Sequence, residues 1–167
     1  MIVPESGAGL LDTSTLILLQ RIEDPTHLPS IPLLSAVTLA ALSVGPLVVT
    51  DERERASRLA LLQQVESDFS PLPFDDAAAR CFGRVAASLR RAKRKPAARA
   101  YDVLIAAIAM ANELPVYTVN PRDFAGIDDL LVQDTAYVQN WSLTNDAKIL
   151  VETFLPGREF TVGILGR

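Results

Sequence analysis

The chain has almost none of the residues that bind zinc or form disulfide bonds. Its 167 residues include one cysteine, Cys81, and one histidine, His27. A single cysteine excludes a disulfide framework and any CxxC zinc or redox site. A single histidine excludes an HExxH metalloprotease motif and argues against a Ser/His/Asp triad. This sparse use of cysteine is typical of a protein in the reducing cytoplasm.

Long apolar segments are missing as well. No uncharged apolar stretch reaches the roughly 18 residues that a membrane-spanning helix needs. The first six residues, MIVPES, lack the basic and apolar regions of a secretory signal peptide. With 49% hydrophobic and 22% charged residues, the composition is that of a globular domain, not of a disordered or collagen-like chain. We therefore expect a soluble cytoplasmic protein that does not contact a membrane.

The charge is unevenly distributed. The net charge is −4, yet residues 80–99 hold eight of the 16 basic side chains and no acidic one. A basic segment on an acidic body suits a local contact with a polyanion such as RNA. A solvated helix face with a charged turn would explain the same residues. The candidate phosphate-binding side chains are Arg84, Arg90, Arg91, Lys93, Arg94, Lys95 and Arg99.

The hydrophobic pattern predicts an α/β fold with a parallel sheet flanked by helices. Short apolar or β-branched runs predict strands at 8–11, 31–34, 116–119 and 130–132. Helical spacing and capping residues predict helices at 16–22 (capped by Thr13 or Ser14), 37–44 (closed by Gly45-Pro46), 51–69, 76–93 and 97–112. We divide the chain into a domain at 1–133 and a C-terminal extension at 134–167 with a β-hairpin pattern.

Three aspartates are candidates for chemistry. Asp12 ends the first strand, Asp102 interrupts a mostly apolar helix, and Asp123 follows the strand at 116–119 together with Asn120. In a parallel sheet Asp12 and Asp123 can meet at the carboxyl edge, where functional groups gather. Carboxylate oxygens suit Mg²⁺ or Mn²⁺. The spacing leaves simpler alternatives open, in which Asp12 and Asp123 only cap helices and Asp102 only pairs with Arg99 or Lys95.

Four segments resemble the PIN-domain toxins of the VapC family. They are LLDTS at 10–14, LSAVTLA at 34–40, AYDVLIAA at 100–107 and YTVNPRDF at 117–124. Each is weak alone, whereas four in this order and spacing are fairly specific, and the resemblance covers residues 8–133. It implies a parallel sheet with helices on both sides, an endoribonuclease dependent on Mg²⁺ or Mn²⁺, a cognate antitoxin and a homodimer.

The resemblance also implies roles for individual residues. Asp12 matches the first metal-binding carboxylate of the family, and Asp102 matches the third. Asn120 and Asp123 fall in the region of the fourth, and Ser14 matches a small polar residue near the metal. The second carboxylate is where this chain departs, because Ala41 stands where the family has glutamate in a pattern like TLAEL.

The alanine at position 41 weakens the implied metal site. It donates no oxygen, so we expect reduced metal affinity and no second metal. Either a change made to disarm a toxin or a naturally degenerate copy would explain it. A catalytically silent PIN domain that binds an antitoxin or RNA is therefore the alternative function.

A second resemblance lies in the extension. Residues 148–166, KILVETFLPGREFTVGILG, are similar to a strand pair of ATP-grasp ligases of the D-alanine–D-alanine ligase kind. The rest of that fold is absent, so ligase activity is not implied. A nucleotide-binding function has no further support, because Gly7-Ala8-Gly9 lacks the spacing and the lysine of a P-loop.

Overall fold

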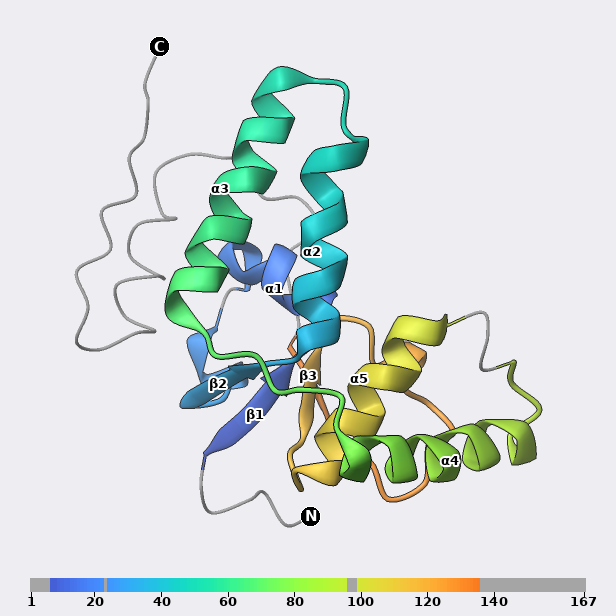
Figure 1. Ribbon diagram of the computed structural model, residues 1–167. Helices are drawn as coiled ribbons and strands as arrows, with labels where there is room; N and C mark the ends of the chain where they lie inside the picture. The colour runs from blue at the N-terminus through green and yellow to red at the C-terminus, as the bar shows by residue number, and fades with distance from the viewer. Residues whose placement is uncertain (1–6, 23, 96–98, 136–167) are drawn as a thin grey trace.

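The fold is built on a four-stranded sheet whose strands all run parallel (Figure 1). The computed structural model describes residues 7–22, 24–95 and 99–135. Along the sheet the strand order is β2-β1-β3-β4. The strands are β1 (Ala8–Leu11), β2 (Ile31–Leu34), β3 (Val116–Thr118) and β4 (Val132–Asp134). The expected α/β fold with a parallel sheet is confirmed.

Two central strands bring the N-terminal and C-terminal halves of the domain together. Leu10 of β1 is aligned with Val116 of β3 and, on its other side, with Leu33 of β2. Leu10, Leu11 and Val116 are completely buried. Strands that are covered on both faces need such continuous apolar runs, which is why these short segments form the centre of the sheet.

Helices cover the sheet in two groups (Figure 1). The helix pair α4 (Asp76–Arg91) and α5 (Ala100–Ala111) packs together and contributes Val85, Leu89 and Ile105 to one hydrophobic core. The short α1 (Thr13–Ile17) lies beside the antiparallel pair α2 (Ala36–Val48) and α3 (Glu52–Asp68), which projects away from the sheet. This second group packs Leu16, Leu42 and Val65 into a separate core.

The first helix differs from its expected form. It begins at Thr13 and ends at Ile17, and a single turn of 3₁₀ helix at Leu19–Arg21 replaces its expected continuation to residue 22. Its N-cap is Asp12, whose carboxylate accepts a hydrogen bond from the backbone N–H of Thr15. The expected caps Thr13 and Ser14 were wrong because the helix begins directly after Asp12, at Thr13, so that both residues lie inside its first turn.

The second helix continues through the expected stop at Gly45-Pro46 and ends at Val48. Proline lacks the N–H that would bond to the carbonyl of Leu42, but it sits in the last turn, where little helix remains to be broken. Packing on α3 supports this turn, since Arg58 Nη1 donates to the carbonyl oxygen of Gly45 at 3.3 Å. The last strand is likewise shifted, to Val132–Asp134 instead of 130–132.

The other helices match their expected positions closely. Asp51 and Asp75 cap α3 and α4 with their side chains. None of the helices in the described part of the chain is long and apolar enough to cross a membrane. The expected hairpin and the ligase-like segment at 148–166 lie outside the described residues, so the extension at 134–167 stays a prediction.

Candidate functional site

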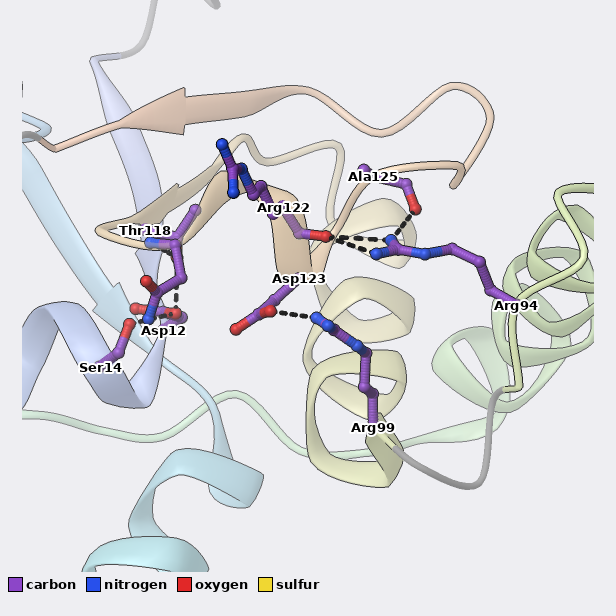
Figure 2. Close-up of polar contacts among 9 residues, drawn as sticks. Asp12, Ser14, Arg94, Arg99, Thr118, Arg122, Asp123 and Ala125 are labelled. Carbon is purple, nitrogen blue, oxygen red and sulfur yellow. Dashed lines mark hydrogen bonds and ion pairs between the residues drawn. The ribbon is translucent and has the colours of Figure 1, made fainter.

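Asp12 lies at the carboxyl end of β1, beside the end of β3 (Figure 2). Its backbone N–H donates to the carbonyl oxygen of Tyr117 at 3.1 Å, which continues the strand pairing. Its side chain is only 5% exposed. Because strands β1 and β3 are parallel neighbours, the residues that follow them share one edge of the sheet.

Both carboxylate oxygens of Asp12 accept hydrogen bonds. Oδ1 accepts from the backbone N–H of Thr15 at 2.7 Å. Oδ2 accepts from Ser14 Oγ at 2.7 Å and from Thr118 Oγ1 at 2.8 Å (Figure 2). Such bonds stabilise a buried carboxylate in its charged form. Asp12 is therefore a helix cap, as one alternative held, and also a fixed anionic group at the sheet edge.

Thr118 is a residue of the candidate site that sequence reasoning missed. It is fully buried at the end of β3. Its hydroxyl group donates a hydrogen bond to Asp12 and accepts one from the backbone N–H of Asn120 at 2.9 Å. The signal was available, because Thr118 lies in the recognised segment YTVNPRDF, two residues before Asn120. Asn120 itself is exposed, and the contact that it makes with Thr118 comes from its backbone N–H and not from its side chain.

Asp102 lies in the first turn of α5 and has a raised pKa. Burial is the main cause, and the negative charges of Asp123 and Asp12 add to it, whereas the positive charge of Arg99 acts in the opposite direction. Together they raise the pKa of the Asp102 carboxyl to about 6. Asp102 forms no ion pair within the described residues, so the alternative interpretation, in which it only pairs with Arg99 or Lys95, is wrong.

Asp123 ends a 3₁₀ turn, Pro121–Asp123, and forms an ion pair with Arg99 (Figure 2). The two side chains are 35% and 36% exposed, so the pair is half-buried. The N-cap of this turn is Asn120, without a side-chain bond, so the capping role considered for Asp123 is wrong. The turn instead carries Asp123 toward the start of α5.

A second arginine fixes the loop that carries Asp123. Arg94 lies three residues after the end of α4 and donates from its guanidinium to the carbonyl oxygens of Arg122 and Ala125 (Figure 2). Two arginines within α4 form ion pairs with the same loop, Arg91 with Asp128 and Arg84 with Asp129. Part of the basic segment therefore contacts the loop at 122–129, while Arg90, Lys93 and Lys95 are exposed and form no ion pair with any described residue.

The donor chemistry of the site matches a hard divalent cation. Asp12, Asp102 and Asp123 offer carboxylate oxygens, and the effect of two of them on the pKa of the third shows that the charges lie within electrostatic reach. In the present arrangement, however, no three His, Cys, Asp or Glu side chains of the described residues are grouped closely enough to hold a metal ion. Asp123 is bound to Arg99, and Ala41, which lies in α2, supplies no oxygen.

Comparison with known proteins supplies the family. The model of the PIN domain matches residues 9–130, which is most of the chain. The chain belongs to the PIN domain family. Among curated PIN-type relatives, Ribonuclease VapC5 of Mycobacterium tuberculosis is 41% identical over 124 residues, covering 73% of this chain and 89% of the relative. At this identity and coverage the VapC branch of the family is also shown.

Solved structures agree with this assignment. This PIN domain is similar to a member of the VapBC family of toxin–antitoxin systems, VapBC-5 from Mycobacterium tuberculosis, with a TM-score of 0.67 and 38% identity. The match covers 78% of this chain and 98% of the other. It is also similar to DNA-bound VapBC from Salmonella typhimurium, with a TM-score of 0.62, 28% identity, and coverage of 77% and 98%. The family resemblance expected from four short segments is confirmed.

Proposed function

We propose that this chain is the toxin of a toxin–antitoxin pair, an endoribonuclease that hydrolyses RNA phosphodiester bonds. One observation carries the proposal: Asp12, fixed by three hydrogen bonds at the carboxyl edge of a PIN-domain sheet, shares a charged environment with Asp102 and Asp123. The relatives named as ribonucleases support the same activity.

A divalent cation, Mg²⁺ or Mn²⁺, is the cofactor we propose, with Asp12, Asp102 and Asp123 as its ligands. When bound, such a cation lowers the pKa of a water molecule and stabilises negative charge on the phosphate. The chain's own contribution is to orient the carboxylates. Ser14 and Thr118 fix the position of Asp12 by donating to its Oδ2 atom.

RNA binding is proposed for the basic segment as backbone contact without base readout. The exposed cations Arg90, Lys93 and Lys95 are the side chains best placed to receive phosphates. Arg84, Arg91, Arg94 and Arg99 belong to the same basic segment, but each bonds to the loop at 122–129. A contact of this type weakens steeply with salt.

A cognate antitoxin and a second copy of the chain are the proposed protein partners, in the cytoplasm. Toxin–antitoxin complexes among the structural relatives support the antitoxin. The α1–α3 region also leaves large apolar side chains in water, with Leu47 83% and Val48 67% exposed at the end of α2. Apolar side chains gathered in one region are typical of interaction surfaces.

Ala41 favours the second candidate function, a silent PIN domain that binds its antitoxin or RNA without cutting. A glutamate at this position would restore the second carboxylate of the family pattern. The test compares this chain with Ala41→Glu on a panel of structured RNAs, with and without Mg²⁺ or Mn²⁺. Ala40→Glu is the matched control, because it adds the same charge to the exposed neighbouring position of α2.

The two functions give different results. Cleavage by Ala41→Glu that requires the cation and exceeds that of the parent chain and of Ala40→Glu supports the ribonuclease, with this chain as its weakened form. If all three proteins are folded, and none cuts RNA or binds a divalent cation, the acidic cluster is structural. The binding module is then the better description.

A further inference from the structure

Arg99 is an unusual residue for the place it occupies. It is the N-cap of α5, where its side chain makes no capping bond, and it lies one helical turn before Asp102. A cation at a helix N-terminus is unfavourable, because the helix dipole places partial positive charge there. Its side chain turns to the acidic site instead and pairs with Asp123 (Figure 2).

The charges around Arg99 show what this contact does. Its guanidinium neutralises Asp123 directly and acts electrostatically on Asp102, on which Asp12 and Asp123 also act. Three carboxylates and one guanidinium leave the site with two negative charges, which one divalent cation balances. A glutamate at position 41 would add a third negative charge. The alanine at this position and the positive charge of Arg99 therefore both reduce the number of cations that the site can bind.

We propose that Arg99 is a built-in counter-cation of the acidic site, which holds Asp123 until a divalent cation displaces it. Arg99 thereby sets the metal affinity of the chain and limits the site to one divalent cation. The inference rests on the proposed function in one respect, the use of these carboxylates as metal ligands. It adds that the chain contains its own cation, Arg99, which competes with the metal for the carboxylate of Asp123.

The contact is suited to exchange because of its partial exposure. Both side chains are about one-third exposed, and a pair with this access to water is held far less tightly than a fully buried one. A cation of charge two attracts a carboxylate more strongly than a guanidinium of charge one does. Displacement would release the Arg99 guanidinium beside the site, in a position to approach a phosphate.

The test measures Mn²⁺ binding directly, by calorimetry and by the electron paramagnetic resonance signal of free Mn²⁺, without RNA. The proteins are the full chain, Arg99→Gln and the control Arg90→Gln. The control removes the same charge from an exposed arginine at the end of α4 that forms no ion pair with any described residue. Removing a cation next to the metal should tighten Mn²⁺ binding by about tenfold, and the control should leave it within about twofold.

A second measurement needs no variant and covers the case in which Arg99→Gln does not fold. An arginine-selective dicarbonyl reagent is applied to the full chain with and without Mn²⁺, and modified peptides are quantified by mass spectrometry. Displacement from Asp123 should increase modification of Arg99 upon addition of Mn²⁺. Arg90 should react equally in both conditions.

The outcomes separate this inference from the proposed function. Unchanged or weaker Mn²⁺ binding by folded Arg99→Gln, two Mn²⁺ ions per wild-type chain, or Arg99 modification that does not rise would each overturn the counter-cation role. In these cases the ribonuclease proposal would still stand on its own cleavage assay. If neither the chain nor folded Arg99→Gln binds Mn²⁺, the carboxylates are not metal ligands and both proposals fail.

Discussion

Asp12 and Thr118 are 106 residues apart in the sequence, yet Thr118 Oγ1 donates a 2.8 Å hydrogen bond to Asp12 Oδ2. The bond joins the ends of two neighbouring parallel strands, β1 and β3. Both side chains are buried, so water cannot easily replace a lost partner. The orientation of the acidic group therefore depends on the threonine of the adjacent strand.

Replacing Thr118 with valine should destabilise the domain and impair the site. Valine keeps the shape but leaves Asp12 Oδ2 with only its bond from Ser14 and leaves the backbone N–H of Asn120 without a bond, at a cost of about 1–3 kcal/mol. RNA cleavage, measured in the Ala41→Glu background, should fall about 10- to 100-fold, as for the loss of other supports of metal ligands. Urea unfolding and cleavage rates provide the two measurements.

Thr135→Val is the control for this prediction. Thr135 is equally buried and its hydroxyl shares a 3.3 Å hydrogen bond with Thr15, without touching Asp12. The Thr135→Val substitution should lower the free energy of unfolding but leave RNA cleavage close to that of the Ala41→Glu protein. Equal losses of cleavage in the two variants would show that Thr118 acts only through general stability.

The raised pKa of Asp102 predicts a dependence of stability on pH. In the unfolded chain this carboxyl titrates near 3.8, and in the folded domain at about 6. The folded state therefore binds more protons between these values, so its stability falls as pH rises from about 4 to 6 and stays lower above. At neutral pH the domain carries the cost of a half-buried charge.

Asp102→Asn should remove this cost. Solvent screening reduces the full effect of the shift, so we expect a gain of about 1 kcal/mol in unfolding free energy at pH 7. The gain should disappear near pH 4, where the wild-type carboxyl is neutral in the folded state. Denaturant unfolding of both proteins between pH 4 and pH 7, with a chelator present, measures this gain. A gain that is the same at all pH values would contradict the electrostatic cause.

Gly9 and Gly83 should respond oppositely to alanine. A Cβ atom on Gly9 in β1 would lie 2.2 Å from Cε2 of Tyr117, in a packed region of the sheet. Gly9→Ala should destabilise the domain by about 1–3 kcal/mol. Gly83 lies in α4 with nothing within 4 Å of the added atom, so Gly83→Ala should stabilise it by about 0.5–1 kcal/mol. Thermal unfolding of both variants gives the comparison.

The basic segment should divide into structural and RNA-binding cations. Arg90→Ala and Lys95→Ala remove exposed charges, so each should weaken RNA binding and reduce its logarithmic salt slope by about 0.7–0.9. Arg94→Ala removes the bonds to the carbonyl oxygens of Arg122 and Ala125 and should instead lower stability by about 1–2 kcal/mol. Binding isotherms at several salt concentrations distinguish the two classes, and an equal slope change in all three variants would contradict the division.

The sequence by itself determined the class of fold and the acidic residues of the site. A short apolar run at 8–11 specifies a strand that is buried at the centre of the sheet, and side-chain caps such as Asp51 and Asp75 specify where helices begin. These signals are local, because they depend on residues a few positions apart. For the same reason Asp12, Asp102 and Asp123 could be selected from their positions next to such elements.

Only the tertiary structure decided which residues the acidic groups contact. The bond of Asp12 with Thr118, and the pairing of Arg99 with Asp123 rather than Asp102, depend on segments that the sheet and α5 bring together. The continuation of α2 through Pro46 likewise depends on its packing against α3. Local patterns specify elements, whereas partners across the sheet follow from strand order and register, which no single segment contains.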